Sequence, residues 1–273
     1  MRSSIQGKVT VITGASSGIG MASAREFAKA GATLVLAARS TDKLETLAAE
    51  LSAITKVVTV TTDVSKEEDC KHLIQTAVDQ FGRIDVLINN AGISMRAMFK
   101  DVDLAVIHRL MDVNFWGCVY CTKYALPYLL ESKGSLVGVT SIAGFKGLPA
   151  RTGYSASKFA MNGFLDTLRT EHMYDRLHVM TFAPGFTASN VRFAALTANG
   201  TPQGATPRSE EKMMAAPVVA RHLLQGVLHR RNTVILTFWG KVAVLFTKFI
   251  PRAIAKTEYM MMRNEPDSPL AKH

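Results

Sequence analysis

The chain has 273 residues, a formal net charge of +10 at pH 7, and a composition that is 48% hydrophobic and 20% charged. These values are typical of a globular protein and exclude a disordered or collagen-like chain. The basic excess comes without zinc-finger spacing, a basic zipper or an aromatic-interleaved basic run, which argues against nucleic acid as a partner.

Strands and helices are expected to alternate along the chain. Short apolar runs predict strands at 9–13, 33–38, 57–61, 86–89, 135–140, 178–183 and 233–237. Helix-period stretches predict helices at about 19–30, 42–53, 66–81, 101–131, 151–173 and 216–229. The strand runs lack apolar/polar alternation, as expected of parallel strands buried on both faces. The pattern predicts an α/β fold with one doubly wound domain over residues 1–237.

A glycine-rich turn, Thr13-Gly14-Ala15-Ser16-Ser17-Gly18-Ile19-Gly20, joins the first strand to the first helix. Glycine lets backbone N–H groups approach a pyrophosphate, which then sits at the positive end of the helix dipole. The turn therefore predicts a dinucleotide site. The same residues also fit G-x-S-x-G, the nucleophile elbow of a hydrolase, with Ser16 as nucleophile. Against that alternative, the elbow normally follows several strands, and this turn follows the first.

The end of the second strand indicates which dinucleotide is preferred. An NAD site needs a carboxylate here to accept hydrogen bonds from the ribose hydroxyls, and Ala38 cannot accept them. Arg39 can instead pair with a 2′-phosphate. We therefore expect NADP(H) as the cofactor; the alternative is that Arg39 is a solvated side chain at a strand end.

Tyr154 and Lys158 are four residues apart, early in the helix that follows the fifth strand. Residues at this spacing share one helix face, so the phenol and the ammonium can converge on one ligand. A free phenol has a pKa of about 10, and a cation at about 5 Å would lower it by roughly two units. That would suit general acid–base catalysis at neutral pH.

Two further polar residues are candidates for the same site. Ser141 ends the fifth strand, so its hydroxyl should lie at the carboxyl edge of the sheet; the alternative is a structural cap. Asn114 sits in the middle of a predicted helix, where asparagine is unfavourable. Its alternative is a buried amide that bonds to backbone groups.

These motifs resemble the short-chain dehydrogenase/reductase family in order and spacing from residue 8 to about 237. The residues that carry the resemblance are Thr13–Gly20, Asp63, Asn89-Asn90-Ala91-Gly92, Asn114, Ser141, Tyr154, Lys158 and Pro184-Gly185. The resemblance implies a Rossmann fold with a seven-stranded parallel sheet. It also implies hydride transfer between a nicotinamide and a carbonyl or an alcohol.

The resemblance implies a role for each matching residue. Tyr154 would be the acid/base, Lys158 would lower its pKa and hold the nicotinamide ribose, and Ser141 would bind the substrate oxygen. Asn114 would hold a water that relays protons to Lys158. The other residues expected to contact the cofactor are Thr13, Gly14, Ser16, Ser17, Gly18, Ile19, Gly20, Arg39, Asp63, Val64, Asn90, Ala91, Gly92, Pro184, Gly185, Thr187 and Ser189. Ser189 stands where the family usually has threonine.

Within the family, the run from Tyr154 to Gly163 and the extended tail look like the hydroxysteroid dehydrogenase and lipid-ketone reductase branch. That branch includes 3-ketosphinganine reductases and DHRS7-type proteins. The expected substrate is a small apolar ketone or alcohol, lipid- or steroid-like, recognised through Phe145, Leu148, Phe186 and Phe193. A dinucleotide-binding regulator without turnover is the alternative, although a pure sensor would not need the four catalytic residues.

Two regions interrupt the alternation of strands and helices. Residues 185–215 form a long insertion after the sixth strand, which is expected to shape the substrate site. In the extension over residues 238–273, the apolar positions from Phe238 to Ile250 follow helical spacing up to Pro251, with Lys241 and Lys248 seven apart. This amphipathic segment either packs over the cleft or a partner subunit, or lies through residues 238–262 in a membrane interface.

The remaining signals concern thiols, metals, assembly and location. Cys118 and Cys121 form a C-x-x-C pair beyond the first helical turn, so we interpret them as packed thiols, and with Cys70 they indicate a reducing compartment. The histidines lack metal-ligand spacing, so no metal is expected.

The resemblance implies pairing of helices 101–131 and 151–173 in a homodimer or homotetramer. The start of the chain lacks the apolar core of a signal peptide, so we expect a cytoplasmic protein, with peripheral membrane association if the tail contacts lipid.

Overall fold

Seven parallel strands form the central sheet of the protein. The computed structural model describes residues 4–185, 187–188, 191–204, 213–247 and 249–271. The strands lie in the order β3-β2-β1-β4-β5-β6-β9, which confirms the predicted doubly wound α/β fold. Their bounds are β1 (Val9–Thr13), β2 (Thr33–Ala38), β3 (Val57–Thr61), β4 (Val86–Asn89), β5 (Ser135–Val139), β6 (His178–Ala183) and β9 (Thr233–Ile235). The order reverses between β1 and β4, where ligands bind in folds of this kind.

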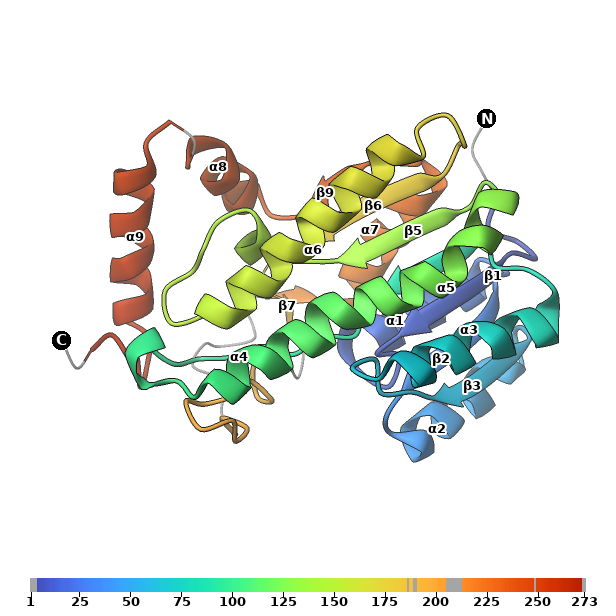
Figure 1. Ribbon diagram of the computed structural model, residues 1–273, viewed down its shortest axis with the longest axis horizontal. Coiled ribbons are helices and arrows are strands. Elements are labelled where there is room, and N and C mark those ends of the chain that lie inside the picture. The colour runs from blue at the N-terminus through green and yellow to red at the C-terminus, as the bar shows by residue number, and fades with distance from the viewer. Residues whose placement is uncertain (1–3, 186, 189–190, 205–212, 248, 272–273) are drawn as a thin grey trace.

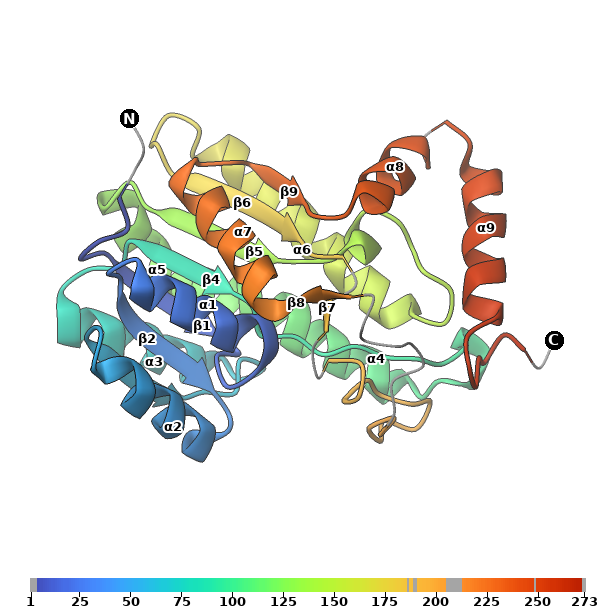
Figure 2. The ribbon, with the colours of Figure 1, turned by 180° about the vertical axis from the view of Figure 1, so that it is seen from behind.

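Helices cover both faces of the sheet (Figures 1 and 2). One layer contains α1 (Gly18–Lys29), α2 (Thr41–Ser52) and α7 (Ala216–Leu228). The opposite layer contains α3 (Glu67–Phe81), α5 (Gly117–Glu131) and α6 (Thr152–Glu171). Each layer packs its own apolar core against the sheet, which explains why the strands are apolar at consecutive positions.

The helix predicted at 101–131 is broken into several pieces. A short 3-10 turn, η1 (Phe99–Asp101), precedes α4 (Leu104–Met111), and a π-helical turn, η2 (Asp112–Trp116), separates α4 from α5. Single π turns occur frequently at functional sites. The turn contains Asn114, so the residue that is unfavourable in a regular helix lies where the helix is irregular.

The insertion after β6 crosses the carboxyl edge of the sheet. Its short strand β7 (Thr187–Ala188) pairs with β8 (Met214–Ala215). Residues 191–204 bind to the segment between β4 and α4, because Arg96 N donates to Leu196 O over 2.8 Å and Leu196 N donates to Ser94 O over 2.8 Å. The insertion is therefore fastened beside the end of β4.

The C-terminal extension forms two helices rather than one. The predicted periodic segment gives α8 (Phe238–Phe246), and α9 (Pro251–Arg263) follows it. Pro251, which we interpreted as a helix end, is the first residue of α9, a position that proline favours. Both views place α9 at the end of the molecule, beyond α8 and away from α2 and α3 (Figures 1 and 2). Across the described part of the chain, every helix is too short or too polar to span a bilayer.

Candidate active site

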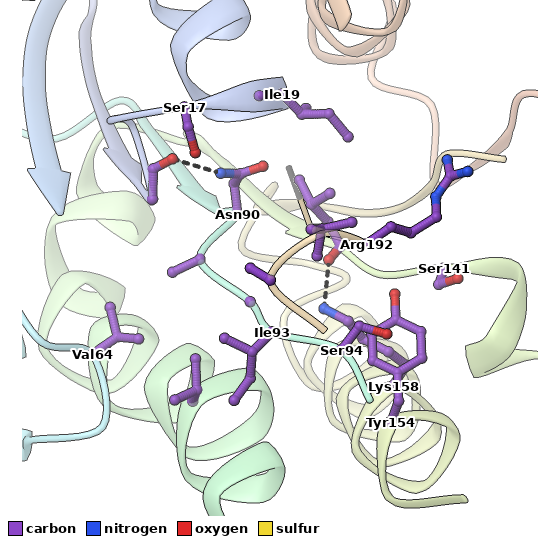
Figure 3. Close-up of a pocket in the computed structure, with 18 of the residues that line it drawn as sticks. Ser17, Ile19, Val64, Asn90, Ile93, Ser94, Ser141, Tyr154, Lys158 and Arg192 are labelled. Atoms are coloured by element: carbon purple, nitrogen blue, oxygen red, sulfur yellow. Dashed lines mark hydrogen bonds between the residues drawn. The ribbon is translucent and has the colours of Figure 1, made fainter. Parts of the chain in front are cut away.

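The glycine turn is packed tightly against the end of β4. Gly14 has a φ of +66°, and a Cβ there would lie 2.8 Å from Ala91 Cα. A Cβ at Gly20 would collide with Gly14 O. Asn90 Nδ2 donates to Thr13 O over 2.9 Å and to Gly14 O over 3.2 Å. Figure 3 shows Asn90 beside the turn that contains Ser17. Glycine is therefore required where the turn approaches β4, and the start of α1 is held facing the cleft.

A cleft of about 380 Å³ runs along the carboxyl ends of the strands from Arg39 to Thr187. It brings together most of the predicted site residues: Gly14, Ser16, Ser17, Gly18, Ile19, Arg39, Asp63, Val64, Asn90, Ala91, Gly92, Ser141, Tyr154, Lys158, Pro184, Gly185 and Thr187. Three others are buried behind this lining and do not belong to it: Thr13, Gly20 and Asn114. The predicted contact at Ser189 lies outside the described residues.

Tyr154 and Ser141 meet at one end of the cleft. Ser141 follows β5 and caps the 3-10 turn η3 (Ile142–Gly144), where its Oγ accepts from Ala143 N over 3.1 Å, so the capping alternative is also correct. Tyr154 lies in the first turn of α6 and packs against the cluster of Met95 and Leu196. Figure 3 shows Ser141 beside the phenol of Tyr154.

Burial dominates the acidity of the Tyr154 phenol. Burial raises the pKa of Tyr154, while the neighbouring Ser141 hydroxyl and the charges of Arg151 and Arg192 lower it by less. The net direction is upward, so the phenol is protonated at neutral pH. This direction is opposite to the predicted acidification, which weighed one cation and omitted the loss of solvent around the ring.

Lys158 lies one helical turn further along and is also buried. Its Nζ donates to Val139 O over 3.0 Å and lies 6.0 Å from the centroid of the Tyr154 ring (Figure 3). Burial lowers the pKa of Lys158 to about 8. The lysine is thus mostly charged at pH 7, and it loses the charge as the pH rises through that value.

Asn114 connects three segments around the lysine. Its Oδ1 accepts from Ile93 N over 2.8 Å, and its Nδ2 donates to Ile93 O over 3.0 Å and to Ser157 Oγ over 2.9 Å. A Cβ at Gly92 would lie 3.1 Å from Asn114 Oδ1 and 3.4 Å from Lys158 Nζ. The amide therefore braces the end of β4 against α6, as the alternative interpretation expected, and the water relay stays a prediction.

Arg39 and Asp63 lie at the other end of the cleft. Arg39 is exposed at the end of β2, and Asp63 follows β3. Burial raises the pKa of Asp63, but hydrogen bonds from Ser65 and the charges of Arg39 and Lys66 together lower it further, so the net direction is downward. The carboxylate is consequently ionised close to the Arg39 guanidinium.

Sequence reasoning missed two arginines that line the cleft near Tyr154. Arg151 Nη1 donates to Ser94 Oγ over 2.7 Å and to Met95 O over 3.0 Å, and Arg192 Nη2 donates to Thr187 O over 2.6 Å. Arg151 is buried at the N-cap of α6, where the helix dipole disfavours a cation, and that conflict was visible in the sequence. Arg192 lies in the insertion, where no pattern marks it.

The predicted apolar contacts are only partly present. Leu148 lines the cleft, whereas Phe145 and Phe193 do not, and Phe193 is exposed. Phe186 lies outside the described residues. The apolar lining comes instead from Ile93, Val113 and Val191, among others.

The C-x-x-C pair lies in the core between α3 and α5. Cys70, Cys118 and Cys121 are all buried and free. Burial raises the pKa of the Cys118 thiol to about 12, which disfavours the reactive thiolate. The packing interpretation of these cysteines agrees with their position.

Known proteins resemble the chain in sequence and in fold. The family described as short chain dehydrogenase matches residues 8–199. An 11-beta-hydroxysteroid dehydrogenase A of Sesamum indicum is 35% identical, over 97% of this chain and 78% of its own length. Dehydrogenase/reductase SDR family member 7B of Mus musculus is 35% identical, over 90% of this chain and 79% of its own length.

Two solved structures have the same fold. A short chain dehydrogenase/reductase from Burkholderia phymatum, in complex with NAD, has a TM-score of 0.83 at 24% identity, over 92% of this chain and 96% of its own. An alcohol dehydrogenase from Thermococcus sibiricus, complexed with 5-hydroxy-NADP, has a TM-score of 0.73 at 28% identity, over 85% of this chain and 96% of its own.

Proposed function

Because this chain belongs to the short-chain dehydrogenase family and is an oxidoreductase of that family, we propose that it reduces the carbonyl of an apolar ketone with NADPH. The relatives named hydroxysteroid dehydrogenase and family member 7B fit the branch expected from the motifs. The observation that carries the proposal is the Tyr154 phenol beside Ser141, at one end of a cleft that is also lined by the glycine turn.

A carbonyl group that is reduced must gain a hydride at carbon and a proton at oxygen. When bound, the reduced nicotinamide supplies the hydride and is oxidised. Ser141 positions the carbonyl oxygen, and Tyr154 donates its proton to that oxygen as negative charge develops. Because burial raises the pKa of Tyr154, the phenol holds this proton at neutral pH and can donate it.

The glycine turn and Lys158 fit a dinucleotide. Side chains at Gly14 and Gly20 would collide with protein atoms, so these glycines let the turn pack closely while it lines the cleft. Backbone N–H groups at the start of a helix can bind a pyrophosphate there. The ammonium of Lys158 would hold the nicotinamide ribose, and Arg39 would pair with a 2′-phosphate. The related complexes contain NAD in one case and 5-hydroxy-NADP in the other, so the preference for NADPH rests on Arg39.

Oxidation of NADPH with a panel of apolar ketones, including steroid ketones, tests the proposal. We expect turnover with at least one bulky apolar ketone, and dinucleotide binding without turnover on any of them would favour the regulator instead. Labelling with a fluorophosphonate tests the Ser16 hydrolase in parallel, and labelled Ser16 would contradict our assignment. Among the described residues that line the cleft, none is a histidine that could activate Ser16.

We propose further that two copies of the chain pair through α5 and α6, as family resemblance implies. Trp116 and Phe159 are 43% and 45% exposed, and Trp116 stacks on Tyr120 with ring centroids 5.6 Å apart. In sedimentation velocity, Phe159→Lys should shift the protein to monomers. Phe99→Lys, at a residue 61% exposed near α4, is the matched control and should stay oligomeric. Unchanged sedimentation of Phe159→Lys would contradict this interface.

We propose that exposed aromatic side chains of the C-terminal extension lie on an anionic lipid surface. Phe238, Trp239 and Phe249 are 71%, 77% and 72% exposed. Lys241 in α8 and Arg252 in α9 are also exposed and complement an anionic surface. Aromatic side chains with flanking cations are typical of helices that bind at membrane interfaces.

Co-sedimentation with vesicles containing phosphatidylserine tests this membrane contact. We expect the double variant Trp239→Ser and Phe249→Ser to lose at least about tenfold in vesicle affinity, because about 1.5–3 kcal/mol is gained for each large apolar side chain that is buried. Tyr174→Ser, at a residue 94% exposed after α6, should bind as the wild type does. Equal vesicle binding by all three proteins would contradict the contact.

A further inference from the structure

Two shielded ion pairs fasten the C-terminal extension to the rest of the protein. Lys146 Nζ lies 3.1 Å from the Glu258 carboxylate, and their side chains are only 8% and 14% exposed. Arg96 Nη2 lies 3.3 Å from the Glu265 carboxylate, with side chains 6% and 7% exposed, and it donates to Pro266 O over 2.8 Å. Charges are rarely withdrawn from water in this way unless they are paired.

The two pairs attach to the segments on either side of Tyr154. Lys146 belongs to the segment between β5 and α6, which begins at Ser141 and ends at the first turn of α6. Asn162 Nδ2 donates to Gly144 O over 2.8 Å and ties this segment to α6. Arg96 belongs to the segment between β4 and α4. The two segments meet where Ala97 N donates to Ala150 O over 3.0 Å.

The C-terminal extension is also packed closely at both of its ends. At the start of α8, a Cβ at Gly240 would collide with Ile142, the residue after Ser141. At the other end, Met262 in the last turn of α9 and Leu270 after the helix are buried, and Ser268 Oγ donates to Met262 O over 2.6 Å. Figures 1 and 2 show α9 along the end of the molecule, between these two packed regions.

We propose that α9 and the turn after it form a brace that fixes the spacing of the two segments flanking Tyr154, with Glu258 and Glu265 as positioning residues for the Ser141–Tyr154 pair. The proposal rests on the proposed reductase function. Glu258 acts through Lys146 on the segment that carries Ser141. Glu265 acts through Arg96 on the segment that carries Ser94, whose Oγ holds Arg151. Burial raises the pKa of Glu258, and the hydrogen bond and charge of Lys146 oppose this effect.

The test compares Lys146→Met, Glu258→Gln and the charge-swapped double variant Lys146→Glu with Glu258→Lys. Each single variant should lower kcat for ketone reduction about tenfold, because small displacements of reacting groups are costly, while the KM for NADPH stays unchanged. The double variant should recover most of the loss. Glu50→Gln breaks an exposed pair with Arg25 far from the cleft and should keep wild-type kcat.

Hydrogen–deuterium exchange provides a readout that does not depend on activity. Peptides covering residues 142–151 should exchange faster in Glu258→Gln than in the wild type and in Glu50→Gln. Unchanged exchange in these peptides, or unchanged kcat in both single variants with only a lowered Tm, would overturn the brace. A wild type that reduces no ketone would instead overturn the proposed function, and the exchange result would still decide the brace.

Discussion

Replacing Tyr154 with phenylalanine is expected to lower kcat for ketone reduction by about a thousandfold. The variant keeps the ring, which packs against Met95 and Leu196, and removes only the oxygen that carries the proton. General acid catalysis by a positioned side chain contributes about a hundredfold to ten-thousandfold. Steady-state oxidation of NADPH with the best ketone of the panel measures the loss.

A matched control and a pH profile sharpen this first prediction. Tyr174→Phe removes a phenol oxygen from an exposed residue and should retain wild-type kcat. Because burial lowers the pKa of Lys158 to about 8, kcat/KM should fall as the pH rises through that value and the ammonium is lost. Lys158→Met should have lower activity, and its kcat/KM should not fall as the pH rises through about 8. Full turnover by Tyr154→Phe would show that another group supplies the proton.

Arg39→Ala is expected to weaken NADPH binding by about a hundredfold while NADH binding changes little. A hydrogen bond to a charged group contributes about 1.5–3 kcal/mol, and only NADPH has the 2′-phosphate that would accept it. Titration calorimetry with each dinucleotide measures the two Kd values. Since Arg39 is exposed, the loss of NADPH affinity caused by Arg39→Ala should become smaller as salt is added.

Arg25→Ala is the matched control for this second prediction. Arg25 is partly exposed on α1, pairs with Glu50 over 2.6 Å, and does not belong to the cleft lining. The variant should keep both Kd values close to those of the wild type. Equal weakening of NADPH and NADH in Arg39→Ala would contradict the 2′-phosphate assignment.

The sheet was predictable because its chemistry is local. Strands buried on both faces must be apolar at consecutive residues, and β1, β2, β3, β4 and β6 have the predicted bounds. The π turn at Asp112–Trp116 was not predictable, since one inserted residue leaves the apolar spacing of the flanking helices intact. The helix α9 was missed because Pro251 was interpreted as a stop, although proline equally favours the first turn of a helix.

The site was predictable where residues share the carboxyl edge of the sheet. The glycine turn follows β1, Ser141 follows β5, and Tyr154 and Lys158 share one face of α6, so the topology brings them together. Side-chain burial could not be derived from spacing. Tyr154 therefore has a raised pKa where a lowered one was expected, and Arg192 enters the cleft from an insertion without periodicity.

Proton donation by Tyr154 is tested most directly by titrating its phenol in the enzyme without added dinucleotide. The ultraviolet difference between the wild type and Tyr154→Phe, recorded from about pH 6 to about pH 9, isolates this tyrosine from the others. Because burial raises the pKa of Tyr154, we predict no phenolate absorbance in that interval. A phenolate signal that develops between about pH 7 and about pH 8 would contradict a protonated donor.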